Sequence, residues 1–249
     1  TTKFNETYLL KGDGSEKAHN VNAHDAGLDG VTLNDKGNGT VAVTLKTLNG
    51  GDKISIAGKN YTIGSTANDV TTAIGTPTKG NKVKVGDTEY TYEDGTSKDS
   101  ANIAVSAGWY VSDTDFSKDT KANWDTAKKA TADLAVAGSK VTVGSKTFAI
   151  INDANTADGI DDNDSTVITA GKAYQLQTAE IVKASSIGAD TAATNATNAN
   201  DAYNTATTTF TLNKGTVSYK DGLSFNLHVG ADADMTNKIT VNIDSMNSA

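Results

Sequence analysis

Residues 222–246 read GLSFNLHVGADADMTNKITVNIDSM, and this stretch sets the fold that we expect for the rest of the chain. Apolar residues alternate with polar ones on both sides of a short acidic segment: Leu223, Phe225, Leu227 and Val229 before it, Ile239, Val241 and Ile243 after it. A period of two is typical of a β-strand with one buried face. Two such strands joined by a small polar turn predict an antiparallel hairpin.

Three further segments share one pattern: a glycine, a lysine, two alternating apolar residues, a glycine-containing turn and a second apolar alternation that begins with an aromatic residue. They are GDKISIAGKNYTI at 51–63, GNKVKVGDTEYTY at 80–92 and GSKVTVGSKTFAI at 138–150. Each copy predicts a hairpin with one buried face. The copies start about 30 and then about 60 residues apart, which argues against a solenoid of constant period.

Other strand and helix signals are shorter. Asn38-Gly39 predicts a hairpin turn between two apolar segments. A short helix is expected after the first repeat, capped by Ser65 and placing Val70 and Ile74 on one face. The strongest helical pattern covers 117–135, where Trp124 and Leu134 share a face.

The segment after residue 170 is harder to interpret. Tyr174, Leu176 and Ile181-Val182 favour more strand, and residues 184–209 suit either a marginal helix or a polar loop. We therefore expect a mainly β, α+β fold of antiparallel hairpins and sheets with one or two short helices. We also expect two nested domains carried by a terminal hairpin.

The composition excludes several classes of function. The chain has 249 residues, a net charge of −8 and 22 basic residues, all of them lysine. An acidic chain without arginine is a poor nucleic-acid binder. No apolar run approaches the roughly 20 residues of a membrane span, and no cysteine is present for a disulfide or a thiolate zinc site.

Candidate sites are few. Asp158, Asp161, Asp162 and Asp164 could hold a hard cation such as calcium, but the 158–164 segment lacks the residue order of an EF-hand, so a solvated loop is expected. His19, His24 and His228 are too scattered for a metal site. Trp109, Tyr110 and Trp124 suit a sugar-stacking platform or, preferably, a core. No residue is assigned a catalytic, metal-binding or cofactor-binding role, and no cofactor is expected.

The two ends of the chain resemble bacterial flagellin. The matching positions are Phe4, Asn5, Leu9 and Leu10 in an F-N-x-x-x-L-L-x-G pattern, and Gly230, Ala231, Ile239 and Ile243 in an L-x-x-x-x-G-A-N-x-G-x-x-x-x-I-x-I pattern. Asp232 stands where the family usually has Asn. The first repeat with its following helix is similar to the IN-type motif of flagellins and hook-associated proteins.

This resemblance implies a structural protein: the surface-exposed outer domains of flagellin, the subunit of the extracellular bacterial flagellar filament, without catalysis. Its partners would be other flagellin subunits in the full filament. The ends look cut and the terminal coiled-coil helices of the family are missing from the sequence, so we expect a fragment that is monomeric alone.

The resemblance also implies a nested domain order. Residues 1–14 plus 221–249 would form the root hairpin segment, 15–77 plus 186–220 an inner domain, and 78–185 a distal variable domain, with Pro77 in a linker.

Two other classes of function stay open. The alternative is an adhesin-like β-rich module that recognises glycan or mucin, for which loss of glycan binding in Trp109→Ala would be evidence. An enzyme ranks third, because the carboxylates cluster in loops without an identifiable acid and base pair.

Overall fold

The computed structural model describes residues 11–18, 28, 30–219, 222–228 and 238–244. These residues contain strands β1–β16 and helices α1–α3, so the mainly β, α+β fold expected from the sequence is confirmed. The chain divides into two compact units. Unit 1 comprises Thr1–Leu45, Thr178–Asn198 and Thr209–Ala249, and unit 2 comprises Lys46–Gln177 and Ala199–Thr208. Pro77 lies within unit 2, and the nested three-part division stays a prediction.

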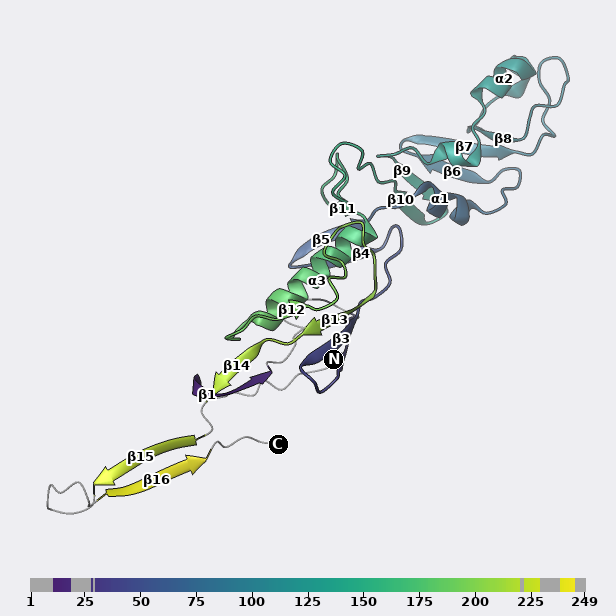
Figure 1. The fold of residues 1–249 in the computed structure, drawn as a ribbon. Coiled ribbons are helices and arrows are strands. Elements are labelled where there is room, and N and C mark those ends of the chain that lie inside the picture. The colour runs from purple at the N-terminus through teal and green to yellow at the C-terminus, as the bar shows by residue number, and fades with distance from the viewer. Residues whose placement is uncertain (1–10, 19–27, 29, 220–221, 229–237, 245–249) are drawn as a thin grey trace. The chain divides into compact units, whose positions relative to one another are not determined.

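The largest sheet belongs to unit 2 and has five strands in the order β10-β9-β6-β7-β8, all antiparallel (Figure 1). Their bounds are Lys146–Ala149 (β10), Lys140–Val143 (β9), Lys82–Val85 (β6), Thr88–Glu93 (β7) and Gly108–Val111 (β8). The second repeat forms the hairpin β6–β7 and the third forms β9–β10, as predicted. The two hairpins meet through their first strands, β6 and β9.

One face of this sheet carries a hydrophobic core. Its fully buried members are Val70, Val83, Trp109, Leu134, Val141, Phe148 and Ile150. Val70 comes from helix α1 (Ala67–Ile74) and Leu134 from the 3₁₀ turn η2 (Thr131–Leu134). The short helical segments thus cover the sheet face that carries the aliphatic and aromatic residues, because burying this apolar surface away from water stabilises the fold.

Helix α1 begins one residue later than the sequence suggested. Its N-cap is Thr66, whose hydroxyl accepts a hydrogen bond from the Asp69 backbone N–H, while the Asp69 carboxylate accepts from the Thr66 N–H. This reciprocal pair is a capping box. Ser65 is instead fully buried. Its backbone N–H donates to the Ala149 carbonyl at the end of β10, and its carbonyl accepts the Ile151 N–H.

The first repeat forms a separate hairpin in unit 2, β4 (Lys53–Ile56) with β5 (Lys59–Ile63). Its turn residues, Ala57 and Gly58, have φ values of 50° and 77°, the left-handed region required by a two-residue hairpin connection. Strand β11 (Val167–Ile168) pairs in parallel with β5, which gives the order β11-β5-β4. Strand β4 is therefore an edge strand of this sheet.

Unit 1 contains a four-stranded antiparallel sheet and two two-stranded ones. The larger has the order β12-β13-β3-β2, with bounds Thr194–Asn195, Thr209–Asn213, Thr40–Thr44 and Thr32–Asp35. The predicted Asn38-Gly39 turn joins β2 to β3. Strand β1 (Lys11–Ala18) pairs with β14 (Thr216–Tyr219), and β15 (Gly222–His228) pairs with β16 (Lys238–Asp244).

Two secondary-structure predictions need correction. The continuous helix expected over 117–135 is broken into η1 (Phe116–Lys118), α2 (Lys121–Ala127) and η2. The break has a cause: the Lys129 backbone exchanges two hydrogen bonds with Trp109 at the edge of β8. The strand expected around Tyr174 is wrong, because residues Ala170–Ser186 form helix α3, the longest helix described.

Candidate functional site

The terminal hairpin is the site to which the flagellin resemblance refers. Strands β15 and β16 pair in the register that alternation predicts, with Leu223 opposite Ile243, Phe225 opposite Val241 and Leu227 opposite Ile239. Ile239 and Ile243 therefore lie on β16 at register positions four residues apart. The remaining motif positions, Phe4, Asn5, Leu9, Leu10, Gly230 and Ala231, lie outside the described residues.

The acidic segment after residue 152 is the candidate cation site, and its carboxylates already have partners. Asp153 accepts backbone N–H groups of Asp158 and Gly159, and Asp161 accepts those of Asn152, Asn163 and Asp164. Asp162 accepts those of Ala154 and Asn155, and Asp164 accepts the N–H and hydroxyl of Thr166.

These hydrogen bonds explain the electrostatics of the loop. The Asn155 N–H holds the pKa of Asp162 below its ordinary value, and the Thr166 hydroxyl does the same for the pKa of Asp164. Asp158 accepts the Ile160 N–H, and the carboxylates of Asp153, Asp158 and Asp162 all lie within 3.3 Å of the Thr156 hydroxyl. Across the described residues, no group of three or more His, Cys, Asp and Glu side chains is placed to hold a metal ion.

The large aromatic residues belong to the core. Trp109 is 1% exposed and Tyr110 2% exposed, and the Trp109 indole N–H donates to the Thr131 hydroxyl at 3.0 Å. Edge-to-face contacts link Tyr110 to Phe116 and Phe116 to Trp124, with centroids 4.9 and 5.4 Å apart. The preferred prediction of core use is confirmed for Trp109 and Tyr110, while Trp124 is half-buried. The buried rings of Trp109 and Tyr110 cannot stack on a sugar.

A hydroxyl and an amine meet at Ser106 and Lys121, which sequence reasoning missed. The Lys121 Nζ donates to the Ser106 Oγ at 2.8 Å and to the Asp125 carboxylate at 2.5 Å. The hydrogen bond from Lys121 holds the pKa of Asp125 below its ordinary value. Lys121 therefore links the Ser106 hydroxyl to the Asp125 carboxylate of α2.

Tyr110 lies beside this cluster. Its hydroxyl donates to the Ser106 carbonyl at 2.8 Å. Burial raises the pKa of Tyr110 to about 12, with the negative charges of Asp125 and Glu93 adding to the effect. The cluster around Ser106 is a set of structural hydrogen bonds between a loop and α2.

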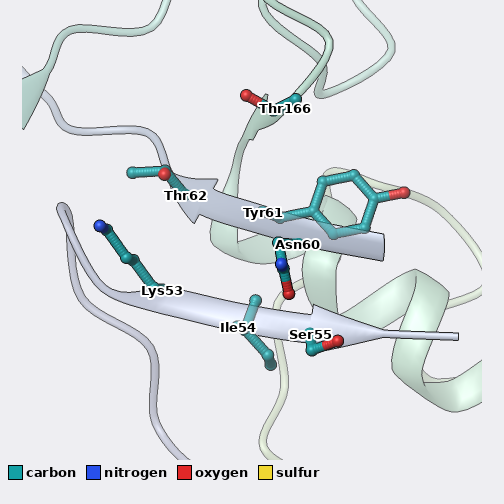
Figure 2. Close-up of a pocket in the computed structure, with 7 residues that line it drawn as sticks. All are labelled: Lys53, Ile54, Ser55, Asn60, Tyr61, Thr62 and Thr166. Carbon is teal, nitrogen blue, oxygen red and sulfur yellow. The ribbon is translucent and has the colours of Figure 1, made fainter. Parts of the chain in front are cut away.

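A hollow of about 610 Å³ lies along the first repeat, and Figure 2 shows its lining. It is lined by residues of β4 and β5 together with one residue of the segment before β11: Lys53, Ile54, Ser55, Asn60, Tyr61, Thr62 and Thr166. Consecutive residues of a strand point to opposite faces. The participation of Lys53, Ile54 and Ser55 together therefore means that the β4 backbone forms part of the wall.

The histidines do not come together in the described part of the chain. His228 lies in β15, whereas His19 and His24 lie outside the described residues. None of the described helices combines the length and the apolar character that a membrane crossing requires.

Comparison with known proteins gives no relative. No protein-family model, no curated protein and no solved structure matches this chain.

Proposed function

We propose that this chain is a structural module, the surface-exposed outer domains of a flagellin-like subunit of a bacterial flagellar filament. The observation that carries the proposal is the terminal hairpin, whose strands β15 and β16 pair Leu223 with Ile243 and Leu227 with Ile239. In the flagellin pattern the same isoleucines belong to the hairpin from which the outer domains extend. The placement of this chain outside the cell follows from that proposal.

The arrangement of the described sheets suits such a role. In each of three short hairpins of one sequence pattern, a tight turn joins the two strands. Such a turn adds few residues whose conformational entropy is lost on folding. The acidic loop is held by its own backbone hydrogen bonds, which gives a defined polar surface. A shell of this kind works by exposing polar loops on a stable framework, and it requires no catalytic residue.

Filament localisation tests the proposal directly. Antibodies raised against the 249-residue chain should label the flagellar filaments of the producing cells in immunogold electron microscopy. Deletion of the gene should remove those labelled filaments and reduce swimming. Labelling confined to the cell body, or unchanged filaments in the deletion strain, would refute the role.

A further inference from the structure

Strand β4 lies at the open edge of its sheet, and the other two repeats show how a strand of this kind can be paired. In the five-stranded sheet the first strand of the second repeat, β6, pairs with the first strand of the third repeat, β9. The first repeat has the corresponding strand β4, and β4 is an edge strand of its sheet. Three repeats make an odd number, so two hairpins pair and one remains.

The pairing of β6 with β9 has approximate two-fold symmetry. Val83 lies opposite Val143, Lys84 opposite Thr142, and Val85 opposite Val141. Lys84 and Thr142 are the equivalent positions of the two repeats, so equivalent residues meet at the centre and the flanking valines exchange places. This relation is the one that a two-fold axis creates between two copies of the same strand.

We propose that β4 pairs antiparallel with β4 of a second copy of this chain in the same register, with Ser55 opposite Ser55 on the two-fold axis. Ile54 then lies opposite the second copy's Ile56, as Val83 lies opposite Val143. The proposal depends on the hairpin registers alone and not on a role in a filament.

The free hydrogen-bonding groups of β4 match this register. Within the hairpin, Ile54 pairs with Tyr61, and Ile56 pairs with Lys59 next to the two-residue turn. The backbone groups of Ile54 and Ile56 therefore bond to β5, whereas those of Lys53, Ser55 and Ala57 point away from it. The equivalent residues of β6 face β9 in the same way: the Gly86 N–H, equivalent to that of Ala57, donates to the Lys140 carbonyl at 2.8 Å. Among the described residues no strand occupies this side of β4.

The side chains at the edge also fit. Ile54 is half-buried at this open edge. A second β4 would cover more of its side chain. Lysine guards many edge strands against pairing. Here Lys53 would lie opposite Ala57 of the second copy, as Lys140 lies opposite Gly86, so two lysines do not meet.

The dimer is expected to be weak. One short strand buries far less than the approximately 1,600 Å² of a standard interface, so pairing needs a high protein concentration. The monomer expected from the flagellin resemblance is then the dilute state of this chain.

The absence of cysteine from the chain permits a clean covalent test. Directly opposed residues of a hydrogen-bonded pair have Cα atoms about 5.5 Å apart, within the range that a disulfide spans. Ser55→Cys should therefore form a disulfide-linked dimer under mild oxidation at high concentration. The matched control is Lys84→Cys, at the equivalent exposed position of the second repeat, where β9 already occupies the edge; it should remain monomeric.

Two further variants test the register and the backbone contact. Lys53→Cys should not cross-link, because the two copies of residue 53 lie four positions apart in this register. Ser55→Pro removes only an outward N–H, which leaves the hairpin bonds intact, and should abolish the concentration-dependent dimer in sedimentation velocity. Circular dichroism checks that each variant is folded. Equal cross-linking of Ser55→Cys and Lys84→Cys, or unchanged association of folded Ser55→Pro, would overturn the proposal.

Discussion

Asp99 joins two segments of unit 2 that lie apart in the sequence. Its side chain is buried, and its carboxylate accepts backbone N–H groups of Ala101 and Ile103 in its own loop and of Lys121 at the start of α2. The N-cap residue of α2, Thr120, makes no side-chain capping bond. Asp99 therefore supplies from a distance the acceptor that a helix start requires.

The charge of Asp99 should make stability depend on pH. Hydrogen bonds, led by that from the Ile103 N–H, hold the pKa of Asp99 below its ordinary value. The carboxylate thus stabilises the fold fully above the unfolded pKa of about 3.9 and loses this contribution as pH falls through the folded pKa. We expect Asp99→Asn to lower the thermal midpoint at neutral pH, and the difference from the parent to shrink in acid.

Thermal melts over a pH series check this expectation, with Asp87→Asn at an exposed turn as the control. A deficit of Asp99→Asn that stays constant down to strongly acidic pH would contradict the role of the charge.

Gly171 is required for space in the first turn of α3. A Cβ atom at this position would lie 2.0 Å from the Tyr203 carbonyl oxygen, which belongs to the backbone and cannot rotate away. Alanine is the better helix former by about 1 kcal/mol. The clash should outweigh this preference, so Gly171→Ala is expected to destabilise unit 2 by about 1–3 kcal/mol in urea unfolding. A net stabilisation would show that the loop at 203 moves freely.

At the scale of elements, the capping box of α1 should be measurable because the helix has only two turns. Thr66→Ala removes the hydroxyl that accepts the Asp69 N–H and should cost about 1 kcal/mol of unfolding free energy. Thr72→Ala, an exposed position within the same helix, is the control and should be neutral or slightly stabilising. Equal effects of the two substitutions would argue against the cap.

The acidic loop should not respond to calcium. A cation bound by Asp153, Asp161 or Asp162 would have to replace the backbone N–H donors that these carboxylates already hold. Millimolar calcium is therefore expected to leave the thermal midpoint unchanged, with magnesium at equal ionic strength as the control. A shift specific to calcium would show that the loop rearranges to bind it.

The hairpins could be predicted from sequence, because a period of two and a glycine turn are local signals. Helix α3 could not. Its buried positions recur at helical spacing but include the polar residues Gln177, Thr178 and Ser185, so the apolar residues alone resemble a strand. The break before η2 was equally hidden, because Lys129 leaves the helix to pair with Trp109, a partner distant in sequence.

The open edge of β4 was also not recognised, although the odd number of repeats was visible in the sequence. Which two hairpins pair is a tertiary choice that the shared pattern does not encode. The register of the β6–β9 contact became known only from the structure. The flagellin motif positions outside the described residues remain a matter of sequence alone.

At the scale of the whole molecule, charge is the clearest property. The chain carries a net charge of −8 at neutral pH and has a pI of about 4.8. Repulsion between molecules falls as the net charge approaches zero. We expect a solubility minimum near the pI, measured as turbidity against pH, and renewed solubility on further acidification. Monotonic precipitation into acid would instead indicate unfolding.

Both tryptophans of the chain, Trp109 and Trp124, lie in unit 2. Tryptophan fluorescence, excited at the red edge of the tyrosine band, therefore reports on unit 2 alone, and unit 1 contributes no signal. Placing an indole at the buried Phe210 of β13 in a variant that lacks the native two would give unit 1 its own optical probe.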